Sequence, residues 1–138
     1  NTSIFVYSQT ASTQLLSYHE LLFLKAEALC RLNRSVEAEP ILKEAVLAAI
    51  VNLEKSVDAA LNAPDVLGYG GLEETTDAIS QEEAALYFDT EVAPLFLLNP
   101  LKETMIQKYL AFFGASGEAP EAYSDFRRMK ALGENLLN

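Results

Sequence analysis

Apolar residues recur every three or four positions over most of the chain, which is the spacing of one face of an α-helix. The first such stretch covers residues 14–32, and Ser12 or Thr13 is suited to cap its N-terminus. Its apolar positions are Leu15, Tyr18, Leu22, Ala26, Leu29 and Cys30. The residues before it, 1–13, have no clear helical spacing and predict an irregular lead-in or a short strand.

A second helix is predicted to begin within residues 35–39 and to end near Leu61. Pro40 is expected in its first turn, where the missing N–H costs least. Its apolar positions are Ala38, Ile41, Leu42, Ala45, Val46, Ala49, Leu53 and Val57. Because so few residues separate the two helices, we expect an antiparallel helical hairpin in which small alanines allow a close approach.

The third helix is predicted to start at Ser80, because Ser80 and Glu83 match a capping box. It runs until Pro94 disrupts it, with a kinked continuation through residues 95–98. The fourth starts at Asn99-Pro100, since proline suits the first helical position. Its apolar face comprises Leu101, Met105, Ile106, Tyr109, Leu110 and Phe113, with Gly114 following.

The last helix spans residues 119–132 and ends at Gly133, with Tyr123, Phe126 and Met129 as its apolar stripe. The aromatic side chains of these last two helices are expected to be largely buried. They are Tyr109, Phe113, Tyr123 and Phe126. If so, replacing Phe126 with Ala should cost about 3–5 kcal/mol of stability.

Residues 62–79 interrupt the helical pattern with Pro64, Gly68, Gly70 and Gly71. This loop is longer than most connections in compact domains, and such loops frequently carry function. Its glycines lack the lysine and the strand–loop–helix context of a phosphate-binding loop. Tyr69 is therefore our one candidate ligand-binding residue.

Together these elements predict an all-α fold: a helical hairpin, three further helices and one long glycine-containing loop, in a single α-helical domain over residues 1–138. Half of the residues are apolar, which suffices for a hydrophobic core. The longest uncharged apolar run, residues 46–51, is far shorter than the roughly 20 residues that a transmembrane helix needs.

The formal net charge is −10, from 20 acidic and 10 basic residues. A surface of this sign repels phosphate backbones and anionic headgroups, so neither nucleic-acid binding nor direct binding to a membrane surface is expected. The single cysteine, Cys30, excludes an internal disulfide and a multi-cysteine metal site, and its place on an apolar stripe is that of a small core residue.

No residue pattern supports catalysis, a cofactor or a metal site. His19 is the only histidine, and no cysteine nucleophile or second histidine at ligand spacing accompanies it, so we expect a partly buried or surface side chain. The neighbouring carboxylates lie on loops or helix starts, where solvated acids complement the helix dipole. They are Glu73 with Glu74, Glu82 with Glu83, and Glu118 with Glu121.

Arg127 and Arg128 are consecutive on the last helix, where they could complement its dipole. Consecutive helical residues point about 100° apart, so at most one of the two arginines faces the core side. An arginine on that side requires a carboxylate or carbonyl groups to satisfy its donors.

The first hairpin resembles a tetratricopeptide unit, a helix pair that stacks on its neighbours with a period of about 34 residues. One good unit is visible, over residues 17–50. It is therefore either part of a platform for a protein partner or an ordinary helical hairpin.

Four segments in their order along residues 14–130 resemble the C-terminal portion of the SusD/RagB-like family, nutrient-binding outer-membrane lipoproteins of Bacteroidetes. The first, E-x-x-x-x-K-A-E-A, is matched by Glu20, Lys25, Ala26, Glu27 and Ala28, and the second is the short helix at residues 82–88. The third, I-x-x-Q-K-Y/W-x-A-L-F, is matched with a one-residue compression by Ile106, Gln107, Lys108, Tyr109, Ala111, Phe112 and Phe113. The fourth, E-A-W-x-D-Y/W-R-R, is matched by Glu121, Ala122, Tyr123, Asp125, Phe126, Arg127 and Arg128, although residues 129–132 depart from the family's T-G-Y-P continuation.

This resemblance implies a non-enzymatic, cofactor-free component that binds an oligosaccharide or another nutrient. It would act on the outward-facing surface of the outer membrane and deliver the nutrient to a TonB-dependent, SusC-like transporter. The chain lacks the lipid-attachment cysteine and most of the family's length, so we expect a fragment or a truncated member. Membrane attachment is expected only through a lipid anchor absent from this chain.

A soluble tetratricopeptide-like adaptor that binds a protein through the first hairpin is the alternative interpretation. It predicts further helix pairs at a spacing of about 34 residues upstream. The family resemblance instead predicts purification together with a barrel transporter.

Overall fold

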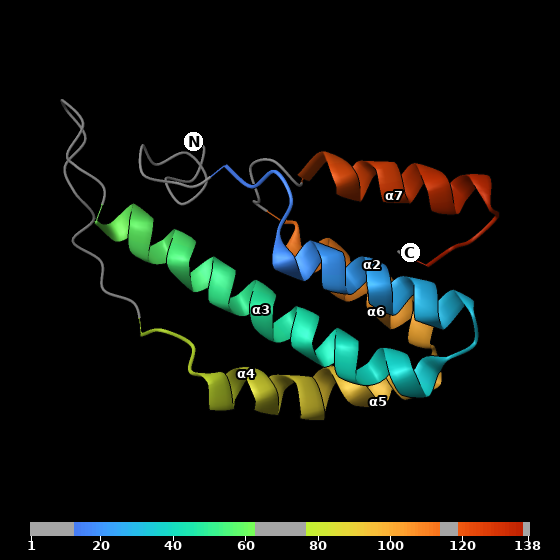
Figure 1. Ribbon diagram of the computed structural model, residues 1–138, viewed down its shortest axis with the longest axis horizontal. Helices are drawn as coiled ribbons and strands as arrows, with labels where there is room; N and C mark the ends of the chain where they lie inside the picture. Colours follow the sequence, from blue (N-terminus) through green and yellow to red (C-terminus); the bar gives the residue numbers. More distant parts are fainter. Residues whose placement is uncertain (1–12, 63–76, 114–118, 137–138) are drawn as a thin grey trace.

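The computed structural model describes residues 13–62, 77–113 and 119–136, and every regular element within these ranges is helical (Figure 1). In chain order the elements are α2 (Tyr18–Arg31), α3 (Ser35–Leu61), α4 (Gln81–Tyr87), the π-helical segment η1 (Phe88–Val92), α5 (Ala93–Leu98), α6 (Pro100–Ala111) and α7 (Ala119–Ala131). Because η1 joins α4 and α5 into one continuous helix, the described ranges contain a hairpin and three further helices. The predicted all-α fold is confirmed.

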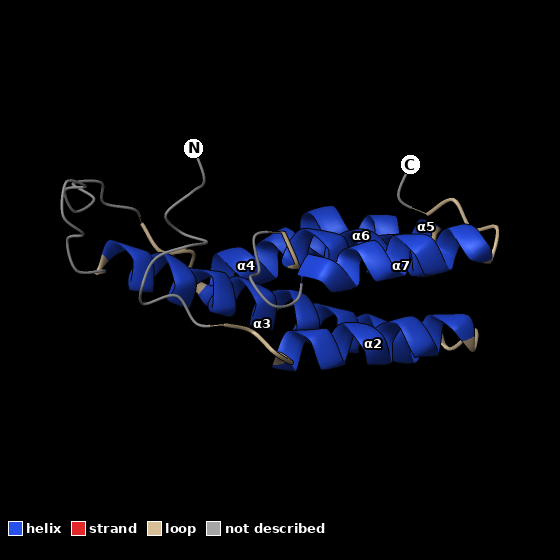
Figure 2. Cartoon of the chain, turned by 90° about the horizontal axis from the view of Figure 1, so that it is seen from above, coloured by secondary structure: helices blue, strands red, loops and turns tan. Residues whose placement is uncertain are grey.

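The helices α2 and α3 form the predicted antiparallel hairpin, and the continuous helix α4–η1–α5 runs along the other side of α3 (Figure 1). The helix α6 contacts both members of the hairpin and also α5. Seen from above, α2 lies in one layer while α6 and α7 lie in another (Figure 2). The helix α7 thus lies on the α6 side of the bundle, at its edge (Figures 1 and 2).

The core lies where the hairpin meets α4–η1–α5. It consists of Leu22, Phe23, Ala26, Ala38, Leu42, Ala45, Val46, Phe88, Val92 and Phe96. The alanines Ala26, Ala38 and Ala45 have no exposed surface, which confirms that small side chains allow the two long helices to approach closely. Burial of these apolar side chains is the main favourable contribution to the fold.

The first helix begins later than the sequence predicted. Its N-cap is Ser17, whose hydroxyl accepts a hydrogen bond from the N–H of Glu20 at 3.0 Å, rather than Ser12 or Thr13. Leu15 therefore precedes the helix and is exposed. Tyr18 is also exposed, and the fully buried aromatic residue of this helix is Phe23, which the predicted stripe omitted.

The second helix has the predicted bounds, with a small difference in the place of its proline. Pro40 is the sixth residue of α3 and not part of its first turn. The backbone bond that it cannot make would have reached Val36, whose side chain is exposed, so water can satisfy that carbonyl. Leu53, predicted on the buried stripe, is 51% exposed.

The capping box at the start of α4 is present. The N–H of Glu83 donates to the Ser80 hydroxyl at 3.2 Å, and the N–H of Ser80 donates to the Glu83 carboxylate at 2.8 Å. Pro94 lies in the first turn of α5, and the wider π-helical turn of η1 comes directly before it. A π-turn of this kind lets the helix continue past a residue that lacks an N–H, so the predicted continuation is confirmed.

The start of α6 and the end of α7 are those predicted, whereas α6 ends at Ala111, before the predicted Phe113, and Gly114 lies outside the described residues. The side chain of Asn99 accepts a hydrogen bond from the N–H of Lys102 at 3.1 Å, and Pro100 is the first residue of α6. After α7, Gly133 adopts a positive φ of 71°. The N–H of the next residue, Glu134, returns to the carbonyl of Met129 at 2.9 Å, as in a Schellman motif. This turn directs Glu134 back toward the bundle.

Two leucines on α3 provide a test of where the core lies. Leu42 has no exposed surface and Leu53 is half exposed. We expect Leu42→Ala to lower the free energy of unfolding by about 2–5 kcal/mol, because it leaves a cavity among packed side chains. The matched control Leu53→Ala should lower it by less than about 1 kcal/mol. Urea unfolding followed by circular dichroism measures both, and equal losses would contradict this placement of the core.

Candidate functional site

The aromatic residues of the last two helices do not form the core, so the expectation that they are buried is wrong. Tyr109 is 48% exposed, Phe113 81%, Tyr123 65% and Phe126 45%. On α6 the buried aromatic residue is Phe112, one position before the predicted Phe113. Both helices are therefore rotated about their axes relative to the predicted orientation.

Polar side chains occupy the faces that the aromatic residues were expected to fill. The buried polar residues of α6 and α7 are Glu103, Thr104, Gln107, Lys108 and Asp125. On the facing helix α2, Glu27 is buried as well. Because isolated buried charges are very costly, their partners determine what this region can do.

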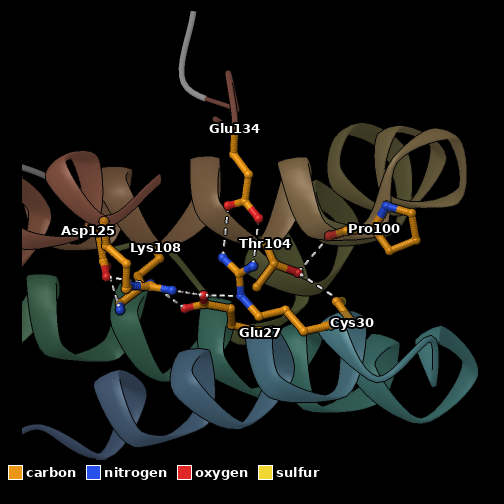
Figure 3. Close-up of polar contacts among 9 residues, drawn as sticks. Glu27, Cys30, Pro100, Thr104, Lys108, Asp125 and Glu134 are labelled. Atoms are coloured by element: carbon orange, nitrogen blue, oxygen red, sulfur yellow. Dashed lines mark hydrogen bonds and ion pairs between the residues drawn. The ribbon is translucent and has the colours of Figure 1, made fainter. Parts of the chain in front are cut away.

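A bidentate ion pair between α2 and α7 lies at the centre of the region (Figure 3). Two guanidinium nitrogens of Arg128 donate to the two carboxylate oxygens of Glu27, at 2.6 and 2.9 Å. Arg128 also donates to Asp125 at 2.7 Å, and the other oxygen of Asp125 accepts from Lys108 Nζ at 2.6 Å. Three helices, α2, α6 and α7, are joined by these contacts.

The pairs continue through Arg31, on the turn of α2 that follows Glu27. Its Nε donates to Glu27 at 2.7 Å, and its two terminal nitrogens donate to the carboxylate of Glu134 at 2.8 and 3.0 Å. We call the whole set the ion-pair network; its members are Lys108, Asp125, Arg128, Glu27, Arg31 and Glu134. It contains three cations and three carboxylates, so its formal charges cancel.

The network confirms the prediction made for the two consecutive arginines. Arg128 faces the bundle and is satisfied by carboxylates, whereas Arg127 points elsewhere and lies over the ring of Tyr123, 5.9 Å from its centroid. Inside the network, Lys108 Nζ also lies over the ring of Phe112 at 5.5 Å. Such a contact favours a cation that has lost most of its water.

The protonation states of the network follow from its geometry. Burial acts to raise the pKa of Glu27, but the hydrogen bonds from Arg128 and Arg31 outweigh it and leave that pKa lowered. The hydrogen bond from Arg31 lowers the pKa of Glu134, and the bonds to Glu27 and Asp125 raise the pKa of Arg128. With lowered pKa values, Glu27 and Glu134 are ionised at neutral pH.

Beside the network lies a set of uncharged contacts. Thr104 donates to the carbonyl of Pro100 at 2.8 Å and lies 3.6 Å from the sulfur of Cys30 (Figure 3). Cys30 is half-buried and packs against the core, as predicted, and burial raises the pKa of its thiol. A raised thiol pKa at neutral pH favours an unreactive side chain.

His19 is 3% exposed, so it is a buried side chain and not the partly buried or surface one that was expected. Its ring centroid lies 6.3 Å from that of Phe112, with the planes tilted by 59°. Across the described ranges no group of three or more histidine, cysteine, aspartate and glutamate side chains is placed to hold a metal ion. In the same ranges no helix is long and apolar enough to span a bilayer.

The acidic pairs considered from the sequence have no common site within the described residues. Glu82, Glu83 and Glu121 are exposed, and Glu83 serves as a helix cap. The others, Glu73, Glu74 and Glu118, lie outside the described residues, as does the candidate ligand-binding residue Tyr69 with its glycine loop. The assignment of Tyr69 therefore stays a prediction.

A mixed polar and apolar groove of about 540 Å³ lies where the start of α2, the middle of α3 and the start of α4 meet. The Tyr18 hydroxyl donates to the Glu44 carboxylate at its edge, and the Gln14 amide donates to Asn52 at 3.3 Å. Further polar residues of the lining include Lys55, Ser80 and Gln81. This groove could not be predicted from the sequence, because its contacts join residues 26 and 38 positions apart.

A second groove of about 260 Å³ is almost entirely apolar. Its lining includes Phe23, Ile50, Leu53, Leu110 and Phe113. Its polar side is formed by Tyr87, whose hydroxyl donates to the Gln107 side chain at 3.3 Å, and by Gln107 itself. Of these two grooves, the larger one thus has more side chains that can form hydrogen bonds with a ligand.

The chain is similar to a solved structure, described as a SusD/RagB family protein from Bacteroides thetaiotaomicron. The two share 55% sequence identity and superpose with a TM-score of 0.84. The match covers 99% of this chain and 28% of the solved chain. No protein-family model matches the chain, and no curated protein matches it.

The outward orientation of the aromatic residues leads to a direct test on α7. Phe126 is 45% exposed, so Phe126→Ala should lower the free energy of unfolding by less than about 1 kcal/mol. Met129→Ala, which removes the buried apolar side chain of the same helix, should cost about 2 kcal/mol or more. Thermal or urea unfolding of the two variants checks the order, and a larger loss for Phe126→Ala would contradict the orientation of α7.

Proposed function

This chain is a SusD/RagB-like family sequence over nearly its whole length, and from that premise we propose that it belongs to a non-enzymatic nutrient-binding protein. The observation that carries the proposal is the 55% identity over 99% of the chain. At that level of identity the same fold is expected throughout the matched region, and the superposition agrees with this. The nutrient class that we propose is an oligosaccharide.

The chain spans about a quarter of the length of the solved relative, with 28% of that chain matched. We take it to be a single helical domain from the C-terminal part of a longer SusD-like protein. The working partner is a TonB-dependent, SusC-like transporter, and the site of action is the outward face of the outer membrane. Attachment to the membrane is assigned to a lipid anchor outside this chain.

The ion-pair network has a scaffolding role in this account. Four of its six members, Glu27, Lys108, Asp125 and Arg128, belong to the segments that resemble the family. Each of these four charges is paired within the chain, and the side chains of Glu27, Lys108 and Asp125 are also buried, so they are not available to a ligand. The motif residues therefore hold helices together and leave nutrient contact to other surfaces.

The larger groove is the described surface best suited to contact a saccharide. It combines the half-exposed ring of Tyr18 with a carboxylate and two amides, namely Glu44, Asn52 and Gln14. Hydroxyl groups of a sugar can both donate to and accept from such side chains, and an aromatic face suits its C–H surface. A volume of about 540 Å³ lies within the range of small-molecule sites.

The alternative, a tetratricopeptide-like adaptor for a protein partner, is favoured by a different observation. Apolar side chains of the hairpin, among them Leu21, Leu24 and Val51, are exposed. Exposed apolar surface of this kind marks protein contacts when it is contiguous. An adaptor would bind a soluble protein and would have no need of a transporter or a sugar.

The proposal is tested by titrating the chain calorimetrically with malto-, xylo- and manno-oligosaccharides. We expect at least one to bind, and Tyr18→Ala or Asn52→Ala to weaken that binding by roughly tenfold through loss of stacking or hydrogen bonds. Tyr109→Ala, which truncates a similarly exposed tyrosine on α6, is the matched control and should leave the affinity unchanged.

A second measurement separates the two functions. Affinity purification from detergent-solubilised outer membranes should recover a barrel transporter with the tagged chain. Absence of any sugar binding, together with recovery of a soluble protein in place of a transporter, would refute the nutrient-binding proposal in favour of the adaptor.

A further inference from the structure

The helix α7 has an unusual interface with the rest of the chain. Among its described residues, Met129 is the one apolar side chain that is buried, and Asp125 is the buried polar one. Its aromatic residues, Tyr123 and Phe126, are turned to solvent. Burial of apolar side chains drives most helix packing, and α7 buries few of them against the rest of the chain.

Charges occupy the surface beneath α7 instead. The Lys108 side chain is 3% exposed and that of Glu27 is 5% exposed. The carboxylate that Lys108 binds belongs to Asp125, so it departs if α7 departs. Glu27 would retain Arg31 but would lose the bidentate contact from Arg128.

Such ion pairs give a smaller net docking energy than their short distances suggest. Their attraction must offset the cost of removing each charge from water, and replacing buried pairs by apolar side chains is frequently neutral or stabilising. When α7 detaches, Lys108 and Glu27 become hydrated again, and the free energy of this hydration offsets part of the lost ion-pair attraction. The α2–α3 interface, built on Phe23 and Leu42, has no comparable compensation on opening.

We infer that α7 is a detachable helix: it opens as a unit from α2 and α6 when Glu27 and Glu134 are protonated, while the rest of the bundle stays folded. The reasoning concerns the chain's own contacts and holds whether or not the chain binds a nutrient. The opening exposes the buried face of α6 that carries Lys108 and the face of α2 that carries Glu27.

The direction of the pH effect follows from the groups that meet at the network. From α2 these are Glu27, Cys30 and Arg31, from α6 Lys108, from α7 Asp125 and Arg128, and from the segment after α7 Glu134. The docked state lowers the pKa of Glu27 and of Glu134 below the ordinary 4.5. Their contribution to docking is complete above that value and is lost as the pH falls through the lowered pKa values.

Hydrogen exchange measured by mass spectrometry tests this opening in the full 138-residue chain. After correction for intrinsic rates, we expect protection of the α7 amides to fall about tenfold or more between pH 7 and about pH 3.5, with α3 changing by less than about twofold. Equal loss in both helices, or α7 amides without protection at pH 7, would overturn the inference.

Variants test whether the ion pairs are the cause. At pH 7, Glu27→Gln should lower α7 protection about tenfold while α3 is unchanged. The control Glu37→Gln breaks the exposed Arg34–Glu37 pair and should change neither helix. If Glu27→Gln prevents folding, Arg128→Gln makes the same test from the outer side of the pair, and unchanged α7 protection in the folded variant would count against the inference.

Discussion

The arrangement of the last two helices depends on one interaction, the bidentate ion pair between Glu27 and Arg128. Glu27 is a residue of α2 whose side chain is buried beneath α7, and a buried carboxylate must be paired. Once Arg128 points inward to meet it, Asp125, three residues earlier on the same face, must also point inward. Lys108 then completes the pairing from α6. The outward position of Tyr123 and Phe126 is the geometric consequence.

Helix positions could be predicted from the sequence because they depend on local chemistry. The capping box at Ser80 and Glu83, the start of α6 at Pro100 and the end of α7 at Gly133 each rest on a few neighbouring residues. The sequence predicted that at most one of Arg127 and Arg128 faces the core side and that this arginine needs a carboxylate or carbonyl groups, but it did not say which of the two it is. The prediction could not identify Glu27 as that carboxylate, because the two residues are 101 positions apart.

The rotation of α6 and α7 about their axes could not be predicted, for a physical reason. Apolar periodicity identifies a buried face when polar residues are solvated, and here the polar residues satisfy each other instead. On α6, Lys108 is buried and its neighbour Tyr109 is half exposed, which is the reverse of what hydrophobicity alone predicts. The groove at Tyr18 escaped prediction for a similar reason, since it arises only when α2, α3 and α4 come together.

The residues that position the helices and the residues suited to contact a ligand are different sets in this chain. The segments that resemble the SusD/RagB-like family supply paired charges that fix helix positions, and the groove at Tyr18 supplies side chains suited to a ligand. A residue typical of the family is therefore not necessarily a residue that touches its nutrient. Under the proposed nutrient-binding role, this separation allows the network to be fully paired within the chain while a different surface contacts the ligand.

The most direct test is a double-mutant cycle between Glu27 and Arg128, using Glu27→Gln, Arg128→Gln and the double variant in urea unfolding at pH 7. The account predicts a coupling free energy of about 1–3 kcal/mol, reduced from the fully buried case because the Arg128 side chain is 40% exposed. A coupling below about 0.5 kcal/mol would show that the two single losses simply add, and would contradict the central role of this ion pair.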